Sequence, residues 1–157
     1  DVLFLGYDDG LLQPTLELRR DLVRTIRQQK PVAVLTSDPS RFFSGDHYIN
    51  HPDHRAAGQA ALDAVAPASA MPLLWPEEGE PHRVQRVYIY GNNEPNVWID
   101  ISETIDQKIA ALKQHASQLG DWDPTERIMN WSAEVGKEKG LAHAECFRMI
   151  ALEQPES

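Results

Sequence analysis

Short apolar runs alternate with an amphipathic segment in the first 36 residues, and this order constrains the fold more than any other feature. Val2–Leu5 and Val32–Thr36 are apolar runs of the length found in buried strands. Between them, residues 15–29 carry apolar side chains at helical spacing, and Pro31 ends that pattern. Strand, helix and strand in this order predict a βαβ unit with parallel strands, and therefore a Rossmann-like α/β fold.

The rest of the chain continues the alternation of strands and helices. We predict helices over residues 52–65, from Ser102 onward and after Asp123, and strands over residues 84–90 and 97–101. Residues 147–152 fit either a strand or a helix end. Because no repeat or linker interrupts the pattern, we expect one domain over residues 1–157.

The chain begins inside an apolar run and without Met. We therefore expect a domain that is truncated at its N-terminus. A preceding segment, a companion chain or a second copy of this chain would cover the exposed edge of the sheet.

Charge and composition exclude some classes of partner. The formal net charge is −9, which disfavours nucleic acid. No run of 18 apolar residues is present, so we expect no membrane span. The single cysteine, Cys146, excludes an internal disulfide and favours a reducing compartment, from which we predict the cytoplasm.

The segment Asn50-His-Pro-Asp-His-Arg-Ala-Ala-Gly58 carries the strongest chemical signal. Pro52 suits the first turn of a helix, which places His51 at the cap and His54 three residues later on the same face. Imidazole is the commonest metal ligand, and a helix N-terminus favours anions. The alternative is that Asp53 only caps the helix and that both histidines are ordinary polar surface residues.

This segment resembles the second signature of the PIG-L/LmbE family of zinc-dependent N-acetylglucosamine deacetylases. Leu5-Gly-Tyr-Asp-Asp-Gly10, Glu94–Ile101, Lys108–Gln118 and Glu145–Arg148 also resemble parts of this family. The resemblance implies an LmbE-like three-layer sandwich with a mostly parallel sheet. It also implies hydrolysis of an N-acetyl group on a small-molecule sugar conjugate, with Zn²⁺ as cofactor.

The resemblance assigns roles to four residues. His54 would be a zinc ligand, and His51 would stabilise the tetrahedral intermediate or protonate the leaving amine. Asp53 would orient His51, and Asp9 would contact a sugar hydroxyl. The family's first His-Pro-Asp-Asp motif, which supplies the other ligands and the general base, does not occur in this sequence. We therefore expect these 157 residues alone to be inactive, and the alternative is a non-catalytic binding or regulatory remnant of the fold.

For the remaining histidines, the tryptophans and Asp38 we predict structural roles and not catalytic ones. We predict that His115 is packed and hydrogen-bonded, and that His47, His82 and His143 lie at the surface. The four tryptophans are expected to be buried or half-buried. Asp38 is expected either to form a turn or to bond the loop that precedes His51.

Overall fold

The computed structural model describes residues 2–91 and 94–152. These residues form two compact units, one containing residues 2–91, 94 and 148–152 and the other containing residues 95–147. The expected single domain over residues 1–157 stays a prediction. Among the described residues, no helix has the length and apolar character needed to cross a membrane.

The first unit contains a βαβ arrangement. Strands β1 (Ala33–Ser37) and β4 (Arg86–Tyr90) pair in parallel, with Ala33 opposite Arg86. Helix α2 (Pro52–Val65) lies between them in sequence and packs against β1. The last part of β6 (Ala144–Ala151) pairs with β4 in the antiparallel direction. The predicted Rossmann-like α/β class is confirmed, and the described part of the sheet is mixed.

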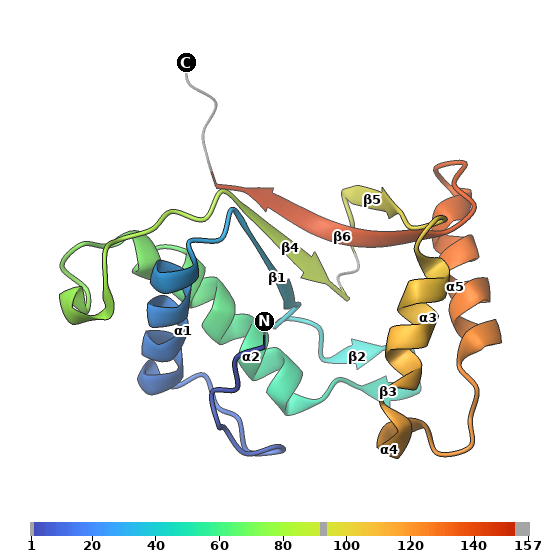
Figure 1. The fold of residues 1–157 in the computed structure, drawn as a ribbon, viewed down its shortest axis with the longest axis horizontal. Helices are drawn as coiled ribbons and strands as arrows, with labels where there is room; N and C mark the ends of the chain where they lie inside the picture. Colours follow the sequence, from blue (N-terminus) through green and yellow to red (C-terminus); the bar gives the residue numbers. More distant parts are fainter. Residues whose placement is uncertain (1, 92–93, 153–157) are drawn as a thin grey trace. The chain divides into compact units, whose positions relative to one another are not determined.

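Helix α1 (Leu16–Gln29) packs beside α2, as Figure 1 shows. It begins where the side chain of Thr15 accepts a hydrogen bond from the N–H of Leu18, at 3.2 Å, which caps the first turn. It ends where Lys30 adopts a left-handed conformation just before Pro31. The buried residues of the core are Val23, Ile26, Ala64, Val65, Ala68, Val84, Val87 and Ile89.

The predicted strand at Val2–Leu5 is wrong. Residues 2–8 have no regular secondary structure, and the side chains of Val2 and Phe4 are 79% and 87% exposed. A strand exists only when its backbone groups pair with a neighbouring strand, and none of the described strands pairs with this run. The βαβ unit is therefore formed by β1, α2 and β4, and α1 precedes it.

The strand predicted at Val32–Thr36 is present, but only one of its faces is buried. Val34 packs against the core, whereas the next residue, Leu35, is 60% exposed. Successive side chains of a strand point to opposite faces, so in the described residues the helices cover one face of β1.

The connection between α2 and β4 contains two short 3₁₀ helices, η1 (Ala68–Ala70) and η2 (Pro76–Glu78). The guanidinium of Arg27 is buried beneath it and donates to the carbonyls of Ser69, Trp75, Met71 and Leu74 at 2.7–3.2 Å. The buried carboxylate of Glu78 forms ion pairs with Arg20 and Arg24. These charged residues of α1 fix a segment that has little regular structure.

The second unit is built from β5 (Val97–Asp100), the first part of β6, and helices α3 (Ile105–Lys113), α4 (Ala116–Leu119) and α5 (Thr125–Lys137). Ile101, Ile105 and Ile109 form its core with Ile128 and Met129. The helix predicted after Asp123 is confirmed, but its N-cap residue is Pro124, one residue later than expected, and the carboxylate of Asp123 accepts hydrogen bonds from Thr125.

Candidate functional site

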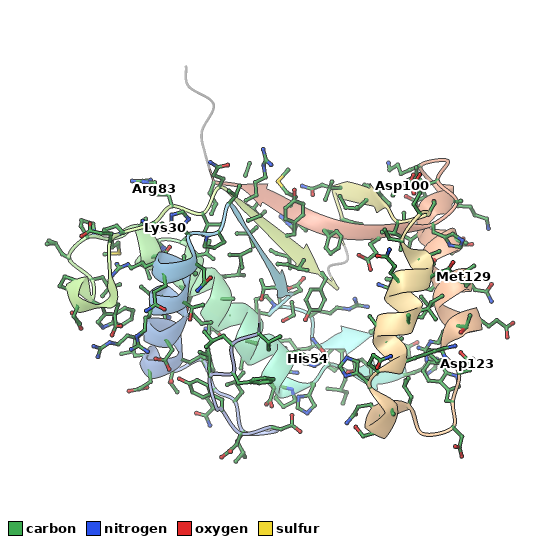
Figure 2. All side chains as sticks on the ribbon, viewed as in Figure 1. Lys30, His54, Arg83, Asp100, Asp123 and Met129 are labelled. Carbon is green, nitrogen blue, oxygen red and sulfur yellow. The ribbon has the colours of Figure 1, made fainter. Side chains whose placement is uncertain are left out.

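Two imidazoles meet at the first turn of α2. His51 is the N-cap residue, and its Nδ1 accepts a hydrogen bond from the backbone N–H of Asp53 at 3.2 Å. His54 lies one turn along the helix, at the position labelled in Figure 2, and the two ring centroids are 5.5 Å apart. Both side chains are exposed. The proximity that the three-residue spacing predicts is therefore present, in a position accessible to a ligand.

The carboxylate of Asp53 faces a different segment. Its Oδ2 accepts a hydrogen bond from the N–H of Gly10 at 2.6 Å, and its Oδ1 accepts one from the N–H of Leu12 at 3.3 Å. The distance from Oδ1 to Nδ1 of His51 is 3.9 Å, which is longer than a hydrogen bond. Asp53 therefore holds the backbone of residues 10–12 against the start of α2.

Asp9 lies in the turn that Asp53 holds. Its side chain is exposed, and the following residue, Gly10, has a φ of 81° that suits glycine. At the other end of this segment, the hydroxyl of Tyr7 donates to Asp21 at 2.8 Å. Burial and the neighbouring carboxylate raise the pKa of Tyr7 to about 12. The turn that carries Asp9 is thus attached to α1 and to α2.

A cleft of about 160 Å³ adjoins His54. Its lining comes from the ends of β1 and β4, from α2, and from the segment with the two-stranded ribbon β2 (Phe43–Ser44) and β3 (Tyr48–Ile49). The lining residues are Ser37, Asp38, Arg41, Ser44, Tyr48, Asn50, His54, Tyr90 and Gly91. The carboxyl ends of the two parallel strands meet here, which is where ligands bind in open α/β sheets.

Gly58 allows α2 to approach the end of β1. A Cβ atom at position 58 would lie 2.4 Å from the carbonyl oxygen of Ser37 and 3.0 Å from its Oγ. The same Ser37 hydroxyl donates a hydrogen bond to the carbonyl of His54. This close packing sets the position of His54 beside the cleft.

Two arginines fix the loop that precedes the histidines. Arg41 donates from Nη1 to the carbonyl of Gly91 and from Nη2 to Oγ of Ser44, each at 2.6 Å. The guanidinium of Arg55 lies 4.3 Å from the centre of the Phe42 ring and donates to the carbonyl of Asn50. The loop is therefore joined to β4 and to α2.

The described residues do not complete a zinc site. A catalytic zinc ion usually takes three protein ligands and a water molecule. Within residues 2–91 and 94–152, no group of three or more His, Cys, Asp or Glu side chains could hold a metal ion. His51 and His54 could contribute imidazole nitrogens, but further donors would have to come from outside this part of the chain.

Several structural interpretations need correction. His115 is exposed and precedes α4, so the prediction that it is packed is wrong. His82 and His143 are half-buried, bonded to the carbonyl of Pro31 and to Ser132 at 2.8 Å, so the surface prediction fails for both. His47 is exposed as predicted.

The predicted burial of the tryptophans is confirmed for two of the four, and one of the two roles predicted for Asp38 is present. Trp75 and Trp98 are half-buried as expected, whereas Trp122 and Trp131 are 48% and 49% exposed. Asp38 is buried and forms a turn with Ser40, which was one of its two predicted roles.

The sequence alone did not predict that Arg41 and Tyr90 line the cleft or that Gly58 lies against the end of β1. A glycine within an Ala-rich helix signals close backbone approach, and this signal could have identified Gly58. Arg41 and Tyr90 line the same cleft because β1 and β4 are neighbours, and no local sequence pattern predicts that neighbourhood.

Comparisons with known proteins agree with this geometry. Residues 1–65 match the family described as PIG-L, GlcNAc-PI de-N-acetylase. Diacetylchitobiose deacetylase of Thermococcus kodakarensis is 32% identical in an alignment of 155 positions, which covers 93% of this chain and 55% of that protein. The probable N-acetyl-alpha-D-glucosaminyl L-malate deacetylase 2 of Bacillus anthracis is 31% identical over 76% of this chain and 49% of its own length.

A solved structure supports the same relationship. The N,N'-diacetylchitobiose deacetylase from Pyrococcus horikoshii superposes with a TM-score of 0.81 and 28% identity, over 94% of this chain and 56% of that one. The chain thus spans about half the length of these two deacetylase relatives, although the matches cover most of its own residues. These matches confirm the resemblance that His51–Gly58 predicts: the chain is similar, in sequence and in fold, to PIG-L/LmbE-type deacetylases of N-acetylglucosamine conjugates.

Proposed function

We propose that the intact protein, meaning this chain with any segment that precedes or follows it, removes an N-acetyl group from a glucosamine-containing small molecule. The observation that carries the proposal is the His51–His54 pair, with ring centroids 5.5 Å apart at the start of α2 and a cleft beside His54. The names of the relatives support the substrate class, because each names a deacetylase of an N-acetylated sugar.

The hydrogen bond at His51 supports a role in proton transfer. Since Nδ1 accepts from the N–H of Asp53, the neutral ring carries its proton on Nε2. In amide hydrolysis, water adds to the acetyl carbonyl, the C–N bond breaks, and the leaving amine takes a proton. The Nε2–H of His51 would stabilise the oxyanion or supply that proton, and the N-terminus of α2 would favour the negative charge.

Asp53 and Asp9 would support these steps in different ways. In this proposal Asp53 orients the site by fixing the cap of α2 and the turn at Gly10. Asp9, which lies in that turn, would accept a hydrogen bond from a sugar hydroxyl.

Zn²⁺ belongs to the proposal as a cofactor, with His54 as one ligand. A bound zinc ion would lower the pKa of a water molecule and so supply the nucleophile. Since the described residues lack a set of three ligands, we expect the 157 residues alone to be inactive. The other donors would come from a further segment, a companion chain or a second copy of this chain. We propose that the intact protein is located in the cytoplasm.

The test compares His51→Ala and His54→Ala with His115→Ala in the intact protein. His115 is exposed and belongs to the second unit, so it is the matched control. We expect each of the first two changes to lower kcat/KM for N,N'-diacetylchitobiose by about 10²-fold or more. We also expect that His54→Ala loses bound zinc, as measured by metal analysis, and that His51→Ala and His115→Ala retain it. Near-normal turnover in both variants would refute the roles of His51 and His54, whereas deacetylase activity in neither wild type nor control would favour the non-catalytic alternative.

A further inference from the structure

We infer that the cleft beside His54 is the subsite for the group attached to the acetamido sugar, and that it selects a neutral sugar ring over an anionic group. The inference rests on the proposed function and specifies which conjugates the intact protein prefers. Its basis is the placement, size and charge of the cleft.

The placement follows from one shared residue. His54 belongs both to the histidine pair and to the lining of the cleft. A substrate whose acetyl group reaches the histidine pair can therefore extend into the cleft. The volume of about 160 Å³ is smaller than the roughly 300–1,000 Å³ of sites for drug-sized ligands, so the cleft suits one ring.

The lining has the chemistry that binds sugar rings. Tyr48 and Tyr90 are about half exposed, at 53% and 46%, and can present aromatic surface together with hydroxyl groups. Asn50 and Ser44 add amide and hydroxyl groups that can bond sugar hydroxyls. A mixture of aromatic surface and neutral polar groups favours a polyhydroxylated ring.

The charges of the lining disfavour an anion. Arg41 is the one Lys or Arg among the lining residues, and both of its Nη atoms already donate to Gly91 and Ser44. The carboxylate of Asp38 is buried nearby and accepts two hydrogen bonds from Ser40. The charges of Arg41 and Asp38 offset each other, so a carboxylate group entering the cleft would meet the negative charge of Asp38 and no net positive charge that favours an anion.

The experiment compares two conjugates with different attached groups. N,N'-diacetylchitobiose carries a second neutral sugar, and N-acetylglucosaminyl malate carries two carboxylates. For the intact protein we expect kcat/KM to be about tenfold or more higher for the disaccharide. Equal rates, or a preference for the malate conjugate, would overturn the inference while leaving the deacetylase proposal intact. Hydrolysis of neither conjugate would refute the deacetylase proposal itself.

A charge placed in the cleft tests whether the cleft causes the preference. Tyr48→Lys adds a cation to the lining, and Phe43→Lys adds the same charge to the neighbouring strand, outside the lining. We expect Tyr48→Lys to shift the ratio of kcat/KM values toward the malate conjugate by about fivefold or more at low salt, and Phe43→Lys to leave the ratio unchanged. Equal shifts in both variants would show that general electrostatic attraction, and not the cleft, sets the preference. Melting temperatures of both variants would confirm that each is folded.

Discussion

The carboxylate of Asp53 accepts a hydrogen bond from the backbone N–H of Gly10, with 2.6 Å between Oδ2 and the nitrogen. The two residues are 43 positions apart in the chain. The contact joins the first turn of α2, which carries both histidines, to the turn that carries Asp9. One side chain therefore determines how two candidate site segments lie beside each other.

Replacing Asp53 should release that turn. In Asp53→Ala both acceptors are lost, and each hydrogen bond to a charged group contributes about 1.5–3 kcal/mol. We expect amide hydrogen exchange at Gly10 and Leu12 to accelerate by about tenfold or more. Asp53→Asn is the matched control, since its amide oxygen can still accept one of the two bonds. If the Asn variant keeps slow exchange but loses activity, Asp53 acts on His51 and not through the turn.

Adding a methyl group at Gly58 should destabilise the protein. At an open helix position, Gly→Ala stabilises by up to about 1 kcal/mol. Here the new Cβ would lie 2.4 Å from the Ser37 carbonyl, so we expect Gly58→Ala to cost about 1–3 kcal/mol. Urea unfolding of the intact protein measures the change, with Gln59→Ala, at the exposed neighbouring position, as control. An increase in stability would show that α2 can move away from β1.

Arg27→Lys should also destabilise the first unit. Arg27 is 2% exposed and donates to at least four carbonyls of residues 69–75. A lysine has three donors on one nitrogen and cannot span these acceptors, so at least one buried carbonyl would lose its partner. We expect a loss of about 2–4 kcal/mol in thermal or urea unfolding. Arg83→Lys, at the exposed position labelled in Figure 2, should change stability little.

The free energy of unfolding should fall in acid, partly because the carboxylate of Glu78 becomes protonated. Hydrogen bonds from Arg24 and Arg20 lower the pKa of Glu78 to about 2, from an ordinary value near 4.5. A lowered pKa means that the contribution of Glu78 to stability is complete above pH 4.5 and disappears as the pH falls toward 2. Glu78→Gln should therefore be less stable than wild type at pH 7, and the difference should shrink between pH 4.5 and 2.

Glu77→Gln provides the control for this pH dependence. The side chain of Glu77 is 54% exposed and has one ion pair, with Arg20. Its replacement should leave the acid unfolding curve close to that of wild type. A pH-independent difference between Glu78→Gln and wild type would contradict the assignment of acid sensitivity to Glu78.

The elements that were predicted well have strong local signals. Residues 52–65 form α2 with the predicted bounds, since proline at the first position and an Ala-rich interior favour a helix wherever the segment lies. The helix predicted after Asp123 is also present, and it begins at Thr125 directly after Pro124. The meeting of His51 and His54 also needs only helical geometry, so the sequence could predict it.

The elements that were predicted badly depend on neighbours. The apolar run Val2–Leu5 has the composition of a strand, but a strand also needs a paired backbone, which composition does not report. The role of Asp53 in orienting His51 stays a prediction, but the sequence did not predict that its carboxylate binds the N–H groups of Gly10 and Leu12. Sequence spacing gave no information on a partner 41–43 residues away.

The sequence by itself determined the α/β class, the helix at residues 52–65 and the histidine pair at its start, because these follow from interactions between residues a few positions apart. Only the tertiary structure decided which segments surround that pair. The cleft exists because β1 and β4 are adjacent, because Gly58 lets α2 approach Ser37, and because Arg41 reaches the carbonyl of Gly91. Each of these contacts joins residues distant in the chain, and their packing energies depend on the folded arrangement as a whole.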